Sequence, residues 1–181
     1  MSMYGVNGGI PKTLVRHLVR YYAEYCCETE NTLKDAGVRN GADLKWEESS
    51  SNLKRALEDV LDTPVSPELL PPVDGVIAQK TEDLVGPYEL HDFFLYYMLR
   101  FGFPPSKIYR IACLTFAEEY DEETILKWLK TFYRRFFAQQ FKRSCLPDGP
   151  KVGSLSVSPR GDLQMPSDAS ASLWLTELES L

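Results

Sequence analysis

Six basic side chains gather in one short stretch of an otherwise acidic sequence. They are Arg134, Arg135, Lys142, Arg143, Lys151 and Arg160. The only acidic residues of this stretch are Asp148 and Asp162, so its net charge is +4, whereas the whole chain carries −6 and the remainder −10. A local field of opposite sign attracts anions, and the stretch is therefore a candidate anion-binding site. A solvated basic loop without a ligand is the alternative that charge alone leaves open.

The basic residues are predicted to lie on a loop that follows a helix. Acidic residues at 120–124 and an apolar stripe as far as about Phe141 predict that helix, whose end delivers Lys142 and Arg143. The following residues favour a shaped loop, because prolines and glycines interrupt regular structure there. They are Pro147, Gly149, Pro150, Gly153, Pro159 and Gly161. We call residues 139–168 the basic loop.

Lys12 is a second candidate for anion chemistry. It follows a glycine-bearing turn, and Pro11 lies in the first turn of a helix predicted over residues 13–27. Backbone N–H groups at the start of a helix favour negative charge, so Lys12 is a candidate phosphate-binding residue. An ordinary solvent-exposed lysine is the alternative.

The remaining elements are predicted to be helical, which makes the fold all-α and irregular, with long loops. Helical spacing recurs in four further segments, 52–61, 87–101, 104–115 and 169–178, the last with Ser167 or Asp168 as its cap. Residues 28–51 predict a polar excursion, and residues 154–157 are the only strand-like run. The aromatic residues of 87–101 favour a buried helix over a cofactor-stacking box, and His91 is interpreted as structural.

Composition limits the functions that the chain can have. With 181 residues and 44% hydrophobic residues it can form one sizeable core, and no apolar run reaches the roughly 20 residues of a membrane span. The acidic total argues against a nucleic-acid partner. The four cysteines show no CxxC spacing, and the first residues do not resemble a secretory signal. Both observations predict reduced thiols in the cytoplasm. Only two histidines are present, so no multi-histidine metal site is expected.

The catalytic motifs that are easiest to recognise are missing from these residues. There is no glycine-rich phosphate loop, no Ser-His-Asp or Cys-His arrangement and no metal constellation. The residues by themselves therefore indicate an anion-binding half-site and nothing further.

Several long motifs resemble the C-terminal part of glutamine-dependent NAD synthetases. They are YGVNGGIPKTLVRHLVRYYA, TPVSPELLPP, IAQKTEDLVGPYELHDFFLYYMLRFG and TILKWLKTFYRRFFAQQFKRSCLPDGPKVGSLSVSPRGD with the later MPSDASA. The resemblance covers nearly all of residues 1–181 and implies the C-terminal portion of an α/β adenine-nucleotide-hydrolase-like synthetase domain. It also implies a ligase that uses ATP and Mg²⁺ to adenylate deamido-NAD and then lets ammonia from glutamine displace AMP.

The resemblance also implies roles for individual residues. Lys142 matches a lysine that contacts deamido-NAD, Arg143 would serve its phosphates, and Asp162 matches an acid near the nicotinate end. Lys12 matches a catalytic lysine at the ATP and pyrophosphate site. Residues 62–86 match a mobile substrate loop that orders when ligand binds.

Two departures qualify this resemblance. Leu163 stands where the family usually has tryptophan, which affects how the substrate would pack. The glutaminase domain, the sheet and the SGGxDS-type loop of the family have no match in these residues, so we expect the chain to be a fragment that is inactive alone. The partners would include the missing N-terminal half of the synthetase and, in a homo-oligomer, further copies. A non-catalytic nucleotide-binding module or an oligomerisation module, with the aromatic face of 88–103 as interface, is the alternative.

Overall fold

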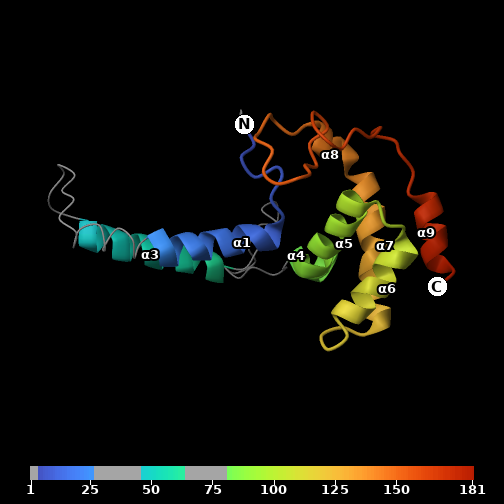
Figure 1. Ribbon diagram of the computed structural model, residues 1–181, viewed down its shortest axis with the longest axis horizontal. Helices are drawn as coiled ribbons and strands as arrows, with labels where there is room; N and C mark the ends of the chain where they lie inside the picture. The colour runs from blue at the N-terminus through green and yellow to red at the C-terminus, as the bar shows by residue number, and fades with distance from the viewer. Residues whose placement is uncertain (1–3, 27–45, 64–80) are drawn as a thin grey trace, which may run out of the picture. The chain divides into compact units, whose positions relative to one another are not determined.

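The computed structural model describes residues 4–26, 46–63 and 81–181, and every regular element in these ranges is a helix (Figure 1). The elements are α1 (Lys12–Tyr21), η1 (Tyr22–Cys26), α3 (Trp46–Asp62), α4 (Thr81–Val85), α5 (Tyr88–Phe101), α6 (Pro105–Thr115), α7 (Glu122–Ala138), α8 (Gln140–Ser144) and α9 (Ser172–Glu179). The described residues contain no strand, and the stretch 154–157 is without regular structure. The predicted all-α class is therefore confirmed. None of the described helices has the length and apolarity that crossing a membrane requires.

The chain divides into two compact units, which we describe separately. One unit comprises residues 12–80, and the other combines residues 1–11 with residues 81–181. We call them the hairpin unit and the core unit.

The hairpin unit pairs α1 and its continuation η1 with α3. The helix predicted over residues 13–27 is confirmed as far as Cys26, although its last turn, Tyr22–Cys26, is a π-helix, and residue 27 lies outside the described residues. The guanidinium of Arg16 donates to the carbonyl of Leu61 over 3.0 Å and thereby joins α1 to the end of α3. No residue of α1 is buried, although its apolar side chains share one face. The hairpin unit therefore leaves an apolar face uncovered by the described residues.

Helix α3 is longer than the sequence pattern predicts. It begins at Trp46, so the serine run 49–51, which we assigned to the irregular excursion, lies within the helix. Serine lowers helix propensity only slightly, and three serines between good helix formers do not end a helix. The helix ends where the N–H and the hydroxyl of Thr63 both donate to the carbonyl of Asp59.

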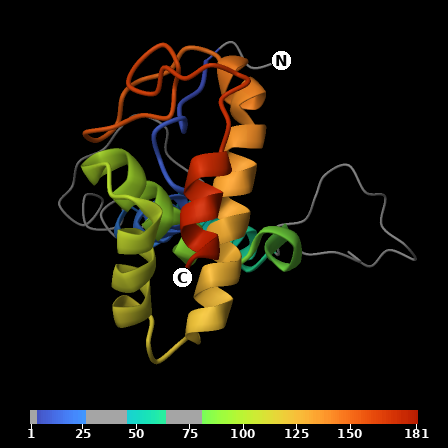
Figure 2. The same cartoon turned by 90° about the vertical axis from the view of Figure 1, so that its right-hand side faces the viewer.

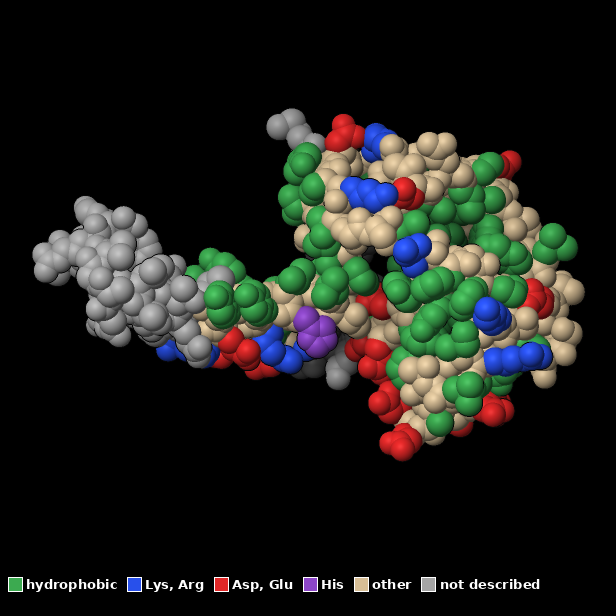
Figure 3. All heavy atoms as spheres, viewed as in Figure 1, with side chains coloured by type: hydrophobic (Ala, Val, Ile, Leu, Met, Phe, Trp, Pro, Cys, Tyr) green, Lys and Arg blue, Asp and Glu red, His purple; other side chains and the backbone are tan. Residues whose placement is uncertain are grey.

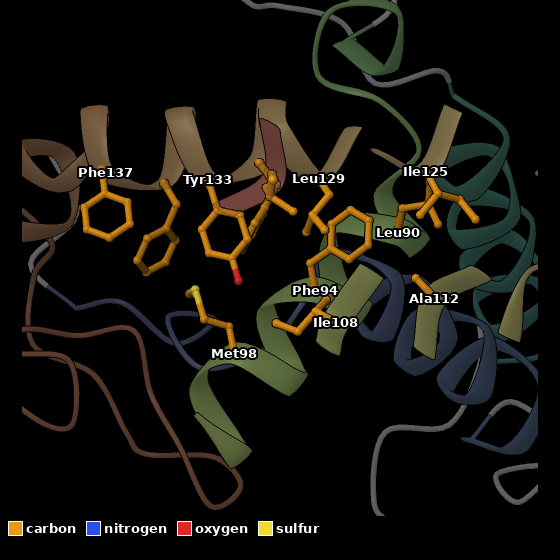
Figure 4. Close-up of a cluster of buried hydrophobic side chains, with 12 residues drawn as sticks. Leu90, Phe94, Met98, Ile108, Ala112, Ile125, Leu129, Tyr133 and Phe137 are labelled. Atoms are coloured by element: carbon orange, nitrogen blue, oxygen red, sulfur yellow. The ribbon is translucent and has the colours of Figure 1, made fainter. Parts of the chain in front are cut away.

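The core unit is built on one face of α7. Its buried residues recur at three- and four-residue steps: Ile125, Leu129, Phe132, Tyr133, Phe136 and Phe137. Figure 4 shows this stripe opposite Leu90, Phe94 and Met98 of α5 and Ile108 and Ala112 of α6. Helix α9 packs against α7 and α6 (Figure 2) and adds the fully buried Leu178. Its Glu177 accepts a hydrogen bond from the N–H of Ser106, one of the unsatisfied donors at the start of α6.

Three helix boundaries follow local signals in the sequence. Gly102 ends α5 with a left-handed φ of 62°. Its N–H donates to the carbonyl of Met98, and the N–H of Phe103 donates to the carbonyl of Tyr97. Pro105 occupies the first turn of α6, and the carboxylate of Asp121 caps α7 by accepting from the N–H of Thr124 over 2.6 Å. These predicted boundaries are confirmed.

Two other boundaries were predicted incorrectly. Helix α7 ends at Ala138 and is followed by the separate short helix α8, whereas the apolar spacing predicts one helix as far as Phe141. Helix α9 begins at Ser172, and neither Ser167 nor Asp168 caps it. Instead, the hydroxyl of Ser170 accepts from the N–H of Ser172 over 3.2 Å. The start of α9 is set by this local serine turn and by packing on α7.

Part of the predicted substrate loop is described, and it is anchored to the core. Residues 64–80 of the predicted loop 62–86 lie outside the described residues, and residues 81–85 form α4. Gly86 follows with a φ of 95°, and a Cβ placed on it would lie 2.5 Å from the ring of Trp128. His91 donates through Nε2 to the carbonyl of Val85 and packs against the ring of Phe132, which confirms its structural role.

Candidate functional site in the basic loop

Lys142 offers an exposed positive charge on α8. Within the described residues its ammonium group makes no hydrogen bond or ion pair, and its recorded contact is with the ring of Phe141, whose centroid is 6.0 Å away. A flexible, strongly hydrated ammonium group is suited to act as a point charge toward phosphate oxygens. The geometry of Lys142 is therefore compatible with the anion-binding role that the sequence predicts.

Arg143, in contrast, is turned into the protein. Its Nε donates to the side-chain oxygen of Gln140 over 2.8 Å, its Nη2 donates to the carbonyl of Phe136, and its guanidinium lies 4.0 Å from the centroid of the Phe136 ring. Burial lowers the pKa of Arg143 from its ordinary value, although a guanidinium stays charged at neutral pH. Two donors of Arg143 are thus engaged inside the core unit, and the phosphate-binding role remains a prediction.

Asp162 is held by two donors from its own loop. Its carboxylate accepts from the ammonium of Lys151 over 3.0 Å and from the backbone N–H of Ser156 over 2.8 Å. The hydrogen bond from Lys151, followed by the one from Ser156, lowers the pKa of Asp162 from its ordinary value. The carboxylate is therefore ionised and oriented in the described structure.

A second ion pair neutralises another cation of the basic loop. Arg160 pairs with Asp148 over 3.0 Å and also donates to the carbonyl of Leu146. In Figure 3, basic and acidic side chains lie next to one another over the part of the core unit where Figure 1 draws the orange loop. Both acidic residues of the stretch are consequently paired with its cations, and Lys142 keeps its charge exposed.

A pocket lies beside the basic loop, where the first described residues pack against it. The N–H of Gly5 donates to the carbonyl of Asp148 over 2.6 Å, and a Cβ on Gly149 would lie 2.0 Å from the carbonyl oxygen of Gly5. The pocket has a volume of about 420 Å³ and is lined by Tyr4, Gly5, Val6, Asn7, Gly8, Leu146, Pro147, Gly149, Pro150, Ser156 and Ser158. No motif in the sequence predicted this pocket. Glycines in both segments were its only signal, because they allow the two backbones to approach closely.

The predicted site residues fall into both units. Lys142, Arg143 and Asp162 belong to the core unit, and the buried side chain of Gln140 ties α8 to Met165, close to Asp162 in the sequence. Lys12 is the first residue of α1 in the hairpin unit.

The described residues offer no ready site for a metal ion. They contain no cluster of three or more His, Cys, Asp or Glu side chains that could hold an ion. A Mg²⁺ ion prefers several oxygen ligands or phosphate groups, and the described residues by themselves do not provide such a set.

Comparison with known proteins gives one consistent result. The chain is 40% identical to the glutamine-dependent NAD(+) synthetase of Mycobacterium leprae over an alignment of 200 positions. It is 37% identical to those of Mycobacterium bovis and Mycobacterium tuberculosis over alignments of 197 positions. Each alignment covers 99% of this chain and 26% of the relative, so the chain spans about a quarter of the length of these enzymes. No family model matches the chain.

These alignments confirm the resemblance that the sequence motifs predict. The chain is therefore similar to an all-helical part of a ligase. The particular relatives are glutamine-dependent NAD(+) synthetases.

Proposed function

We propose that this chain forms the substrate-binding, C-terminal part of a glutamine-dependent NAD synthetase. The observation that carries the proposal is the 37–40% identity over 99% of the chain to synthetases of that name. The exposed charge of Lys142 and the shaped basic loop support it, because the substrate would be an anionic dinucleotide.

The proposed reaction has two steps. The nicotinate carboxylate of deamido-NAD first attacks the α-phosphorus of ATP, which forms an acyl adenylate and releases pyrophosphate. Ammonia, released from glutamine in a separate domain, then attacks the acyl carbon and expels AMP, which gives the amide of NAD. The described residues do not fit Mg²⁺ by themselves, and we assign no step of the reaction to the ion.

The chain's own residues would bind and orient the substrates. Lys142 would contact deamido-NAD as a point charge, and Asp162 would lie near its nicotinate end, where an ionised carboxylate can accept hydrogen bonds. Lys12, at the start of α1, would neutralise negative charge on the pyrophosphate as it leaves ATP. Residues 62–86 would close over the substrate.

The setting of the reaction forms part of the proposal. ATP would be held by a glycine-rich loop outside this sequence, because residues 1–181 contain no such motif. Among the described cysteines, Cys113 and Cys145 are free thiols, which supports a reducing, cytoplasmic compartment. Assembly with further copies and with a glutaminase domain would complete the enzyme.

A chimera tests this proposal. We expect that the Mycobacterium leprae synthetase, with its matching quarter replaced by these 181 residues, makes NAD from ATP, Mg²⁺, deamido-NAD and glutamine. Changing Lys142→Ala in the chimera should raise the KM for deamido-NAD about tenfold, because one charge-assisted contact is lost. Lys130→Ala, which removes a lysine outside the basic loop, is the matched control and should leave KM unchanged.

Two results would contradict the proposal. One is a folded chimera, judged by its circular dichroism and its elution volume, that produces no NAD. The other is a Lys142→Ala chimera whose KM equals that of the parent. The 181-residue chain alone, in the same assay supplied with ammonia, should produce no NAD above background.

An oligomerisation module is the second candidate function, and a specific observation favours it. Leu14, Leu18 and Tyr21 of the hairpin unit are between 43% and 57% exposed on a helix that buries no residue. On the segment 88–103, which we predicted as the interface, Phe94 is buried in the core, whereas Tyr96 and Phe101 are 54% and 50% exposed, so this interface stays a prediction. A second association surface would lie on α1, which buries none of its residues.

A further inference from the structure

Gln140 has a buried polar side chain whose amide nitrogen and amide oxygen both make hydrogen bonds. The residue is fully buried, its Nε2 donates to the carbonyl of Met165 over 2.9 Å, and its Oε1 accepts from Nε of Arg143 over 2.8 Å. The first bond joins positions 25 residues apart, one at each end of the basic loop. Buried amides with satisfied partners fix a local arrangement, because breaking one bond leaves a desolvated polar group.

Arg143 extends this arrangement to the end of α7. Its donation to the carbonyl of Phe136 satisfies one of the last carbonyls of that helix, which have no partner inside the helix. Stacking on the ring of Phe136 fixes the plane of the guanidinium. The side chain is consequently committed to the C-terminus of α7.

The orientation of Lys142 follows from the same contacts. Residues two positions apart on a helix point to different sides, so burying Gln140 on the inner side of α8 turns Lys142 outward. The observed burial agrees with this geometry, because Gln140 is buried and Lys142 is exposed. The bond to Met165 also fixes the backbone three residues after Asp162.

We propose that Gln140 is a positioning residue that closes the basic loop and orients Lys142, and that Arg143 caps α7 and does not bind phosphate. The expected effect of Gln140 on substrate binding rests on the proposed function. It assigns Gln140, which the sequence analysis did not single out, to the binding of the anionic dinucleotide.

The first test measures the loop in the 181-residue chain without any substrate. Gln140→Met keeps the volume and removes both hydrogen bonds, and we expect trypsin to cleave after Lys151 and Arg160 about tenfold faster. Gln164→Met makes the same substitution at an exposed position of the basic loop and should leave the cleavage rate unchanged. Equal cleavage rates in Gln140→Met and in the unmodified chain would overturn the inference.

The second test measures substrate binding in the chimera described above. Gln140→Met should raise the KM for deamido-NAD about tenfold while kcat changes less than twofold. Because Gln140 is proposed to act through Lys142, the double variant with Lys142→Ala should be no weaker than Lys142→Ala alone. Additive effects of the two substitutions would contradict the positioning role.

Arg143→Lys and Arg143→Ala separate the two roles of the arginine. A lysine keeps the charge but cannot reproduce the stacked, forked contacts with Gln140 and Phe136. If Arg143 caps α7, both variants raise KM to the same extent, and if it binds phosphate, the lysine restores most of the affinity. Recovery by Arg143→Lys would therefore refute this part of the inference.

The two proposals fail in different ways. A Lys142→Ala chimera with unchanged KM contradicts the proposed function. An increased KM in Lys142→Ala, together with normal KM and normal cleavage in Gln140→Met, contradicts the role of Gln140 alone.

Discussion

At the scale of single residues, neighbouring side chains of like charge have unlike environments. Lys142 is exposed, whereas the adjacent Arg143 is bound to Gln140 and Phe136. Lys151 is already paired with Asp162, so its charge is partly offset before any ligand arrives. The net charge of a stretch therefore overstates the charge that it offers to a ligand, and the hydrogen bonds decide which cation remains accessible.

The ionisation of Asp162 gives a prediction at this scale. Its pKa is lowered in the folded state, so its contribution to stability is fully present above its ordinary pKa of 3.8 and is lost as pH falls through the lower folded value. The amide proton of Ser156, which donates to Asp162, should shift with pH at a midpoint below 3.8, measured by NMR titration.

A variant that removes the main cause of the lowered pKa of Asp162 provides the control. In Lys151→Ala the midpoint at Ser156 should move upward, because the hydrogen bond from the ammonium group is removed. The same midpoint in both proteins would show that Lys151 does not hold the carboxylate in its ionised state.

At the scale of elements, local signals allowed some boundaries to be predicted, and tertiary contacts set the others. Gly102, Pro105 and Asp121 act through their own backbone or side chain. The sequence is therefore sufficient to place the end of α5 and the starts of α6 and α7. The break after Ala138 could not be predicted, because apolar spacing continues to Phe141.

The candidate site shows the same division. The cluster of charge, the loop and the exposed lysine could be inferred from residue types. The inward orientation of Arg143 and the double use of Gln140 depend on Phe136 and Met165, which no spacing rule connects to them.

The junction of α4 and α5 gives a prediction at this scale. Gly86→Ala should lower the free energy of unfolding by about 2–3 kcal/mol, because it combines a left-handed φ of 95° with a Cβ 2.5 Å from the ring of Trp128. Unfolding by urea, followed by tryptophan fluorescence, measures the loss.

Gly161→Ala is the matched control for this change. The nearest atom to its Cβ would be 3.7 Å away, so the stability should change by less than about 0.5 kcal/mol. If the two alanine variants were equally stable, the contact between Gly86 and Trp128 would have no energetic importance.

At the scale of the whole molecule, the two units differ in how completely they bury their apolar side chains. The core unit encloses α7 among α5, α6 and α9, whereas α1 of the hairpin unit buries no residue. Exposed apolar faces of this kind mark surfaces that associate with other chains. The difference predicts that self-association occurs through α1.

Light scattering tests this association. The 181-residue chain should increase in mass with concentration, and Leu18→Glu should weaken the association about tenfold by placing a charge on the apolar face. Leu114→Glu, at a residue of the core unit that is 82% exposed, should have no effect. A chain that stays monomeric at high concentration would contradict the prediction.

The contact between Gly5 and Asp148 has a consequence for how the protein acquires its structure. These residues are far apart in the sequence, so the pocket that they border forms only after all the residues between them have been synthesised. Contacts between distant positions are slow to form, because the intervening chain must lose entropy first. Helices α5, α6 and α7 can therefore assemble before the pocket beside the basic loop, whereas α9, which follows the pocket residues in the sequence, packs on α7 after them.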